Sequence, residues 1–372
     1  MNLKVLDLSR VLAGPLCSMI LGDIGADVIK IERPGLGDET RGWGPPFDNE
    51  GASAYFLSVN RNKKSLAADL SDPSDRAVVQ GLMGEADVVL ENFLPGSLSR
   101  VGLDPSRLLE EHPSLIWCTI SGFGIDSERA GYDFVVQAEC GWMSITDEKD
   151  GSPMKVGVAL VDVIAGKDAA IAILAALFER GSGTLPASRR RIVISLAASA
   201  RAALVNVAQN VLVSGNDAGR WGNAHPNLVP YQLFDAADRP FVIAVGSDAQ
   251  WRACALALEL DELAGASNLK TNADRVKNRE RVVESIARRV RELPACEWIG
   301  RLQATGVPCG LVRSVAEALS GTHSSPNTGV APSVPGSIRF APPKLDEDGD
   351  AIRRWGWRAF QPWRRTSPSL HQ

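Results

Sequence analysis

Short apolar runs alternate with amphipathic segments over the first 125 residues. The apolar runs predict strands at 4–8, 27–31, 65–70, 87–90 and 115–121, and helices are predicted at 15–21, 74–85 and 105–111. Strands that alternate with helices are typical of right-handed βαβ crossovers, which build a parallel sheet with helices on both faces. The pattern therefore predicts an α/β fold.

Beyond residue 125 the pattern predicts a long helix at 164–180, where alanine stands at almost every second position. Alanine favours helix formation and lets neighbouring backbones come close. A strand at 189–195 and a helix through Val213 follow. Residues 214–230 are rich in Gly, Asn and Pro, which is typical of a linker or a functional loop. A strand at 241–246 and the helix after it begin a second, smaller unit.

The chain length of 372 residues agrees with two domains at about 150 residues each. We expect a large domain with a Rossmann-like parallel sheet at 1–213, a linker at 214–230 and a small α/β domain at 231–319. Residues 320–372 are expected to form a linker and a tail that returns to the large domain. After Lys344 the tail carries three tryptophans among charges, which indicates loose packing or wrapping on another surface.

Composition narrows the function. With 40 Lys and Arg against 44 Asp and Glu, the chain lacks the positive charge of a binder of nucleic acid or of a membrane surface. No run of 18 apolar residues and no signal-peptide pattern occurs, so we expect a cytoplasmic protein. The six scattered cysteines indicate reduced, mostly buried thiols. Only four histidines are present, which argues against a histidine-rich metal site and favours carboxylates as the chemical groups.

Cations gather in the loops that follow the predicted strands, where ligands of such sheets bind. Loop 32–43 holds Arg33 and Arg41 among three glycines, residues 60–65 add three cations, and Arg100 follows the strand at 87–90. Arginine binds phosphate through two hydrogen bonds, and glycine allows close approach of a ligand. These loops therefore bind a nucleotide phosphate or, alternatively, are solvated loops capped by arginine. Neither G-x-x-x-x-G-K-[ST] nor G-x-G-x-x-G follows the first strand.

Three polar residues have two interpretations each. Asp162 precedes the alanine-rich helix, where it is either an N-cap worth about 1 kcal/mol or a carboxylate that the helix dipole keeps ionised. The second kind of group can attack a thioester or act as a base. His225 in GNAHP has a structural hydrogen-bonding or a catalytic role. Asp248 is either an N-cap or part of a substrate-pocket loop.

Taken in order, the motifs of this chain are similar to those of one known family. They are VLD at 5–7 with AGP at 13–15, GADVIKIERP at 25–34, GD at 37–38, NKKS at 62–65, ENF at 91–93, GYD at 131–133, Asp162 with Gly166, GN-HP at 222–226, Asp248 with QW at 250–251, and GVP at 306–308. The chain resembles the class III CoA-transferases, the family that includes formyl-CoA transferase, carnitine CoA-transferase and α-methylacyl-CoA racemase. The resemblance covers residues 3–315.

The resemblance implies an acyl-CoA:carboxylate CoA-transferase in which Asp162 is the catalytic nucleophile. Asp162 would form an acyl-aspartyl anhydride and then an aspartyl-CoA thioester, from which an acceptor acid takes the CoA. The partners would be an acyl-CoA and a carboxylic acid, and no tightly bound cofactor or metal is expected. The resemblance also implies an interlocked homodimer, in which each chain threads through a ring made by the other.

The resemblance also implies roles for the residues around the site. Arg33 and Arg100 would bind CoA phosphates, the backbones of Ala13 and Ala68 would border the adenine, and Tyr132 and Asp133 would approach the pantetheine near Asp162. The nucleotide cleft would be lined by Asn92, Phe93 and Leu94, and the substrate pocket by Gly246, Ser247 and Asp248.

Departures from the family pattern keep two alternatives open. Tyr132 stands where racemases have a histidine base, and a phenol with a pKa near 10 is a poor base, which favours transfer. Asp248 matches an acidic residue of the racemases, so an α-methylacyl-CoA racemase-type epimerase remains an alternative. Ser71 and Ala130 replace two lysines, so a catalytically impaired CoA-binding homologue is another.

Overall fold

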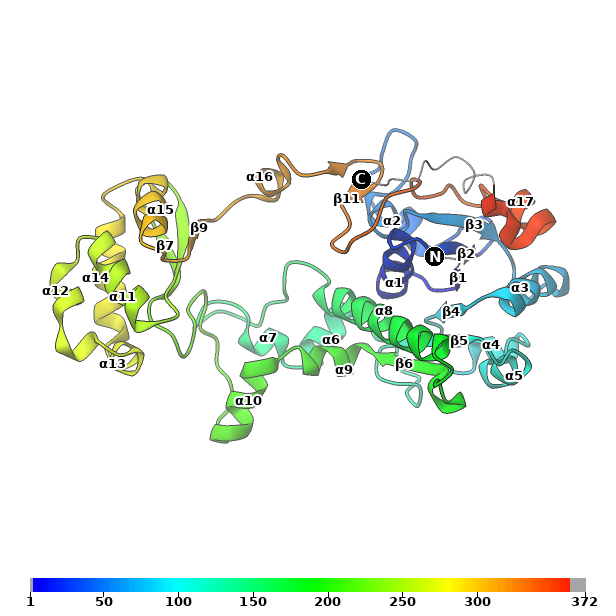
Figure 1. Cartoon of the computed structure of the whole chain (residues 1–372), viewed down its shortest axis with the longest axis horizontal. Helices are drawn as coiled ribbons and strands as arrows, with labels where there is room; N and C mark the ends of the chain where they lie inside the picture. The colour runs from blue at the N-terminus through cyan, green and yellow to red at the C-terminus, as the bar shows by residue number, and fades with distance from the viewer. Residues whose placement is uncertain (1–2, 362–372) are drawn as a thin grey trace. The chain divides into compact units, whose positions relative to one another are not determined.

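The computed structural model describes residues 3–361, which divide into two compact units (Figure 1). Of the described residues, the large unit comprises 3–142, 155–216 and 322–361. The small unit comprises residues 143–154 and 217–321. The chain thus leaves the large unit twice, at residues 143 and 217, and returns to it at residues 155 and 322.

A six-stranded parallel sheet forms the centre of the large unit, as the alternating pattern predicted. Its strands are β1 (Lys4–Asp7), β2 (Asp27–Glu32), β3 (Lys63–Ala67), β4 (Val88–Glu91), β5 (Ile116–Ser121) and β6 (Arg191–Ser195). They lie in the order β3-β2-β1-β4-β5-β6, all parallel. Strand order reverses between β1 and β4, and the crevice at such a point is where α/β sheets bind ligands.

Helices cover both faces of this sheet, so successive strand residues are buried on opposite sides. One core contains Val5, Val28 and Val88 of the strands together with residues of α1 (Ala13–Asp23), α8 (Leu160–Gly181) and α9 (Leu196–Ala202). The opposite core contains Leu6 and Ile29 together with residues of α3 (Pro73–Glu85), α5 (Pro105–Glu111), α17 (Gly349–Trp355) and η4 (Gly356–Phe360).

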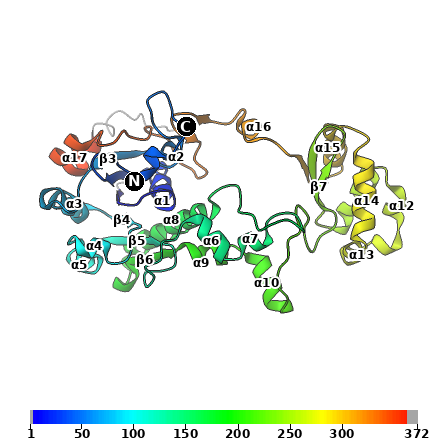
Figure 2. The same cartoon turned by 180° about the vertical axis from the view of Figure 1, so that it is seen from behind.

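Helices α1 and α8 pack closely, as the alanine-rich sequence predicted, and they lie side by side from the front and from behind (Figures 1 and 2). A Cβ at Gly166 would lie 2.6 Å from the carbonyl oxygen of Ala13, so only glycine fits there. Helix α8 begins at Leu160, four residues before the predicted start. Asp162 therefore lies within the first turn of the helix.

The remaining elements of the large unit are short. They are η1 (Glu39–Gly42), α2 (Ala54–Val59), α4 (Ser97–Arg100), α6 (Asp133–Glu139), η2 (Ala187–Arg189), α10 (Val205–Ser214), β10 (Ser324–Ser325) and β11 (Gly329–Val330), while α7 (Trp142–Ile145) continues into residues of the small unit. The single helix predicted through Val213 is wrong: Val205 has a φ of 43°, which breaks it into α9 and α10. By length and composition, no single helix among residues 3–361 could cross a membrane, and one bent pair, α9 with α10, could.

The small unit has an antiparallel sheet of β7 (Tyr231–Asp235), β8 (Pro240–Ala244) and β9 (Cys309–Leu311). The sequence analysis missed β7, which follows directly on the Gly- and Pro-rich segment. The helices are α11 (Asp248–Ala257), α12 (Asp261–Gly265), η3 (Ser267–Leu269), α13 (Asn272–Lys277), α14 (Arg279–Val290), α15 (Ala295–Ala304) and α16 (Val315–Leu319). Trp251, Trp298 and Phe241 are buried in a core of this unit's own.

The C-terminal segment packs on the large unit, and α17 lies beside β3 in Figures 1 and 2. Ile352, Trp357 and Phe360 are buried, so loose packing is wrong for this part of the tail. The segment also covers the free edge of β3, because Asp346 and Asp348 accept hydrogen bonds from its backbone. The rest of the predicted tail, residues 362–372, lies outside the described residues.

All six cysteines are free thiols, and four of them are buried, as predicted.

Candidate functional site

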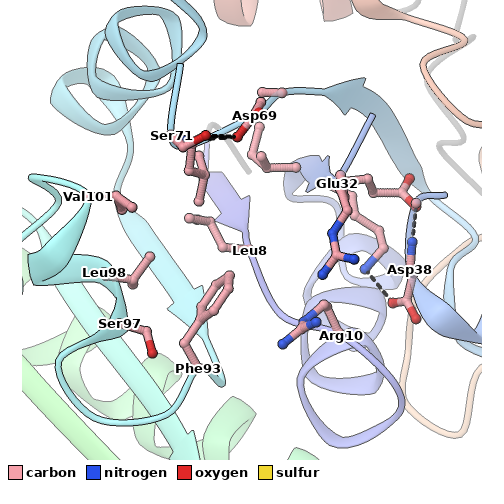
Figure 3. A pocket seen from close by; sticks show the side chains of 16 residues that line it. Leu8, Arg10, Glu32, Asp38, Asp69, Ser71, Phe93, Ser97, Leu98 and Val101 are labelled. Atoms are coloured by element: carbon pink, nitrogen blue, oxygen red, sulfur yellow. Dashed lines mark hydrogen bonds and ion pairs between the residues drawn. The ribbon is translucent and has the colours of Figure 1, made fainter. Parts of the chain in front are cut away.

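A pocket of about 270 Å³ opens at the carboxyl ends of β1, β2, β3 and β4, at the reversal of strand order (Figure 3). Leu8 and Arg10 follow β1, Arg33 follows β2, Ala68 follows β3, and Phe93 follows β4. One side of the pocket is apolar, with Leu98 and Val101 among its residues, and the other side is charged. We call it the nucleotide pocket, because an apolar slot beside cations suits a base and its phosphates.

A buried ion pair forms part of the charged side. The Lys30 ammonium lies 3.0 Å from the Asp38 carboxylate and donates to the carbonyl of Ser9 at 2.8 Å. Burial acts to lower the pKa of Lys30, but the neighbouring carboxylates of Asp7 and Asp38 outweigh it, and the pKa is raised. Asp38 also accepts the backbone N–H of Val11 at 3.2 Å, which holds Val11 at a φ of 71°. Lys30 and Asp38 thus hold the loop after β1 in place through its backbone.

Arg10, which the sequence analysis missed, sits on this fixed loop. Its backbone N–H and carbonyl are both bound by the side chain of Asn92, at 3.0 and 2.8 Å. Its guanidinium pairs with Glu39 at 2.5 Å and lies 5.2 Å from the centre of the Phe93 ring, and its Nε is buried without a hydrogen-bond partner in the described structure. A single arginine in a turn carries no sequence signal, and only the fold reveals its position.

The predicted phosphate ligands fall into three groups. Arg33 is exposed and lines the nucleotide pocket. Arg100 is exposed at the end of α4 and donates to Ser97, a lining residue, at 3.0 Å. Arg41 already has partners within the protein. Its guanidinium donates two hydrogen bonds of 2.7 Å to Glu32, and its Cζ lies 3.7 Å from the centre of the Phe56 ring. The expectation that Arg41 is free for a phosphate is therefore wrong.

The three cations at 60–65 are not free either. Arg61 pairs with Asp23 at 2.7 Å, Lys63 with Asp7 at 3.1 Å, and Lys64 with Asp348. Arg61 and Lys63 are buried, so their charges need these partners. Their role is structural, and the prediction that they add to a phosphate site is wrong.

A second pocket, of about 290 Å³, contains Asp162 and shares Arg10 and Phe93 with the nucleotide pocket. We call it the Asp162 pocket. Ala13, Asn92, Leu94 and Tyr132 also line it, and Arg129 adds a second cation. Of the two alanines predicted to border the adenine, Ala68 thus lines the nucleotide pocket and Ala13 the Asp162 pocket.

Asp162 is not an N-cap, because Ala159 holds that position and Asp162 lies in the first turn of α8. Its side chain lines the pocket, although the residue is only 8% exposed. Burial, together with the negative charge of Asp133, raises the pKa of Asp162 to about 7. Burial thus acts against ionisation of Asp162, in the opposite direction to the expected effect of the helix dipole.

Asp133 is also buried, but its carboxylate faces the backbone of α8. It accepts the N–H of Val161 at 2.8 Å and that of Asp162 at 3.3 Å, and Gln137 donates to its other oxygen at 2.6 Å. Asp133 is therefore close to Asp162, as the resemblance implied, but its hydrogen bonds go to the protein itself.

In the small unit, Gly246 and Ser247 lie between β8 and α11, Asp248 begins α11, and all three are exposed. Ser247 is the N-cap of α11, and Asp248 is its first residue and pairs with Arg275 at 2.9 Å. The N-cap interpretation of Asp248 is therefore wrong by one residue. His225 accepts the N–H of Asn227 through Nδ1 at 3.0 Å, which is the structural role considered for it.

Comparisons with known proteins bear directly on this site. The model of CoA-transferase family III matches residues 1–341. The succinyl-CoA:glutarate CoA-transferase of Mus musculus is 42% identical over 86% of this chain and 73% of that protein, and the succinate–glutarate CoA-transferase of Agrobacterium fabrum is 40% identical over 85% and 80%. The crystal structure of a CAIB/BAIF family protein from Brucella suis matches with a TM-score of 0.81 and 39% identity, covering 95% of this chain and 97% of that one. The chain belongs to the class III CoA-transferases.

Proposed function

We propose that this enzyme moves CoA from succinyl-CoA to a short dicarboxylate, with Asp162 as the covalent nucleophile. The observation that carries the proposal is a buried carboxyl group, Asp162, in a pocket that shares two residues with a nucleotide-sized pocket. The names of the relatives, which are transferases between succinyl-CoA and glutarate or mesaconate, support this donor and this class of acceptor.

The proposed reaction runs through two kinds of covalent intermediate. The Asp162 carboxylate attacks the thioester carbonyl, the C–S bond breaks, and an acyl-aspartyl anhydride and CoA thiolate form. The thiolate attacks the aspartyl carbonyl and releases the donor acid, which leaves an aspartyl-CoA thioester. The acceptor carboxylate displaces the thiolate to give a second anhydride, and the thiolate then attacks the acceptor's carbonyl. Acceptor-CoA leaves, and Asp162 is free again.

The environment of Asp162 suits these steps. Water would hydrolyse either intermediate, and the low exposure of Asp162 limits its access. A carboxylate with a pKa of about 7 is a stronger nucleophile than an ordinary aspartate and is still ionised in part at neutral pH. We therefore expect the rate of the first step to rise with pH through about 7.

Two pockets that meet at Arg10 and Phe93 fit an extended ligand with a nucleotide at one end and a thioester at the other. We propose that CoA lies this way, with Arg10 and Arg33 against its phosphates. Glu39 then competes with the phosphates for Arg10, because the two pair at 2.5 Å.

The nucleophile is tested by trapping. The protein is incubated with succinyl-CoA and hydroxylamine without an acceptor acid, and peptides are analysed by mass spectrometry. A hydroxamate on Asp162, absent in Asp162→Asn, is the expected result. Full transferase activity in Asp162→Asn, or an adduct at another residue, would refute the assignment. Exchange of the α-hydrogen in deuterated water without an acceptor would instead indicate an epimerase.

The CoA position is tested by calorimetric titration of CoA into two matched variants. Arg10→Gln should weaken binding about tenfold, since a charged hydrogen bond contributes about 1.5 kcal/mol or more. Glu39→Gln removes the competitor and should tighten binding. Equal affinities in the two variants would contradict the role of Arg10.

We also propose a homodimer, interlocked as in the family that the sequence resembles. Apolar side chains that are mostly exposed in the single chain support it: Ile171 and Phe178 lie on one side of α8, and Val205, Leu212 and Val213 lie on α10. Exposed apolar side chains in such number are typical of an interface. Light scattering should give twice the mass of the chain, and a monomer at micromolar concentration would contradict the proposal.

A further inference from the structure

The first turn of α8, which carries Asp162, has no cap of its own. The first N–H groups of a helix lack partners within the helix, and a side chain at the N-cap ordinarily supplies one. Here the N-cap is Ala159, which has no polar side chain. The N–H groups of Val161 and Asp162 donate instead to one carboxylate oxygen of Asp133, which belongs to α6.

Asp133 is itself held in place from the other side. Its second oxygen accepts a hydrogen bond of 2.6 Å from Nε2 of Gln137, one helical turn later and fully buried. The other end of that amide, Oε1, accepts the N–H of Val156 at 2.9 Å, in the segment that leads into α8. Gln137 and Asp133 therefore tie both the approach to α8 and its first turn to α6.

The hydrophobic core fixes the base of this arrangement. Val136 of α6 and Val161 of α8 are both fully buried in the same core. The helix that presents Asp162 is thus located by packing and by hydrogen bonds to one carboxylate. The residues that line the Asp162 pocket include Tyr132 and Asp162 but not Asp133.

We propose that Asp133 is a positioning residue for the transfer reaction, which holds the first turn of α8 so that the Asp162 carboxylate stands at the Asp162 pocket. This rests on the proposed role of Asp162 as nucleophile. A shift of about 1 Å in a reacting group costs about 100-fold in rate, so loss of the remote cap should be visible in turnover.

The charge of Asp133 has a second consequence for the same group. It is a negative neighbour of Asp162 and contributes, after burial, to the raised pKa of that carboxyl. Burial raises the pKa of Tyr55 to about 12, and the negative charges of Asp162 and Asp133 add to the rise. The cations that line the Asp162 pocket, Arg10 and Arg129, pair with Glu39 and Glu139.

A charge swap separates positioning from simple stability. Asp133→Asn puts an amide N–H₂ opposite the Gln137 amide, so one hydrogen bond of the chain is lost. In the double variant Asp133→Asn with Gln137→Glu, the asparagine oxygen accepts from α8, its N–H₂ donates to the new carboxylate, and that carboxylate accepts from Val156. Every hydrogen bond is satisfied again, and the negative charge has moved away from Asp162.

Steady-state transfer is measured in each variant. Asp133→Ala should lower kcat about 100-fold and change KM for the acyl-CoA less than threefold, Asp133→Asn should lower kcat less, and the double variant should regain at least tenfold over Asp133→Ala. In the double variant the pH at which hydroxylamine trapping is half-maximal should fall below that of the wild type.

Each other outcome overturns the inference. A kcat in Asp133→Ala within threefold of the wild type, a double variant no faster than Asp133→Asn, or loss of thermal stability with unchanged kcat would leave Asp133 with a purely structural role. Trapping at Asp162 in the wild type is measured in parallel: its absence would refute the nucleophile, whereas its presence with unchanged kcat in Asp133→Ala would refute only the positioning role.

Discussion

Replacing Asp162 by asparagine should stabilise the enzyme, by an amount that depends on pH. The folded state raises the pKa of this carboxyl from 3.8 to about 7, chiefly because it is buried. Below pH 4 the group is protonated in the folded and unfolded chains alike and costs nothing. As pH rises from about 4 to about 7 the unfolded chain loses its proton first, so the stability of the wild type falls.

The size of the effect follows from the shift. A difference of about three pKa units corresponds to about 4 kcal/mol at pH values above 7, and each pH unit between 4 and 7 accounts for about 1.4 kcal/mol. Asp162→Asn removes the titrating group. Between pH 5 and pH 8 its stability relative to the wild type should therefore increase by about 2–3 kcal/mol.

Urea unfolding followed by circular dichroism at pH 5, 6, 7 and 8 measures this change. Asp162→Ala serves as the matched control: it adds a packing defect, which is independent of pH, but loses the same charge. The stabilities of the two variants, each taken relative to the wild type, should rise in parallel with pH and differ from each other by a constant amount. A stability difference between wild type and Asp162→Asn that stays flat over this range would refute the reasoning that the folded enzyme holds this carboxyl in an unfavourable environment.

Two further predictions concern the framework of the large unit. Gly166→Ala should destabilise the enzyme by about 1–3 kcal/mol, because the new Cβ meets a backbone carbonyl of α1. Gly81→Ala, where the new Cβ meets nothing within 4 Å, should stabilise it by up to about 1 kcal/mol. In thermal unfolding the first variant should melt below the wild type and the second above it, and a change of the same sign in both would contradict the reasoning. Lys63→Met should cost about 3–5 kcal/mol by leaving Asp7 buried and unpaired, whereas Lys4→Met, at a partly exposed pair, should cost about 1 kcal/mol or less. Equal losses of stability in the two lysine variants would contradict the buried pair. Burial acts to raise the pKa of Asp7, but Lys63 and other partners lower it to about 2. The stabilisation that the Asp7 carboxylate gives the folded enzyme should therefore be lost as pH drops from about 4 to 2.

The sequence indicated the sheet and the edge at which ligands bind, because fully buried parallel strands form continuous apolar runs. It misplaced what depends on partners distant along the chain. Arg41 and Lys63 look like phosphate ligands in their loops, and the fold turns each toward a buried carboxylate. Arg10 acquires its position only when the loop after β1 meets Asn92 after β4, and Asp133 only when α6 meets α8. The spacing of residues within one segment does not predict such contacts between segments.

Element boundaries failed for local reasons. The N-cap interpretation, one of the two that the sequence allows for Asp162, depends on a helix start at residue 164, whereas α8 starts four residues earlier and takes its cap from Asp133. A cap supplied by a residue distant along the chain leaves no capping residue near the start of the helix, so the sequence there does not indicate where the helix begins. The break before α10 rests on a backbone angle at Val205, a residue type that rarely adopts positive φ, and no residue preference would indicate it.

The covering of β3 by the C-terminal segment sets an order of events during synthesis. Residues 346–360 close the edge of β3 and complete one core of the large unit, yet they are translated some 280 residues after that strand. At 5–20 residues per second this interval is about 15–60 s. Both segments of the small unit, residues 143–154 and 217–321, are synthesised within this interval. A nascent chain therefore carries an open edge at β3 until residues 346–360 have been translated, and that edge is exposed to wrong pairing for the whole interval.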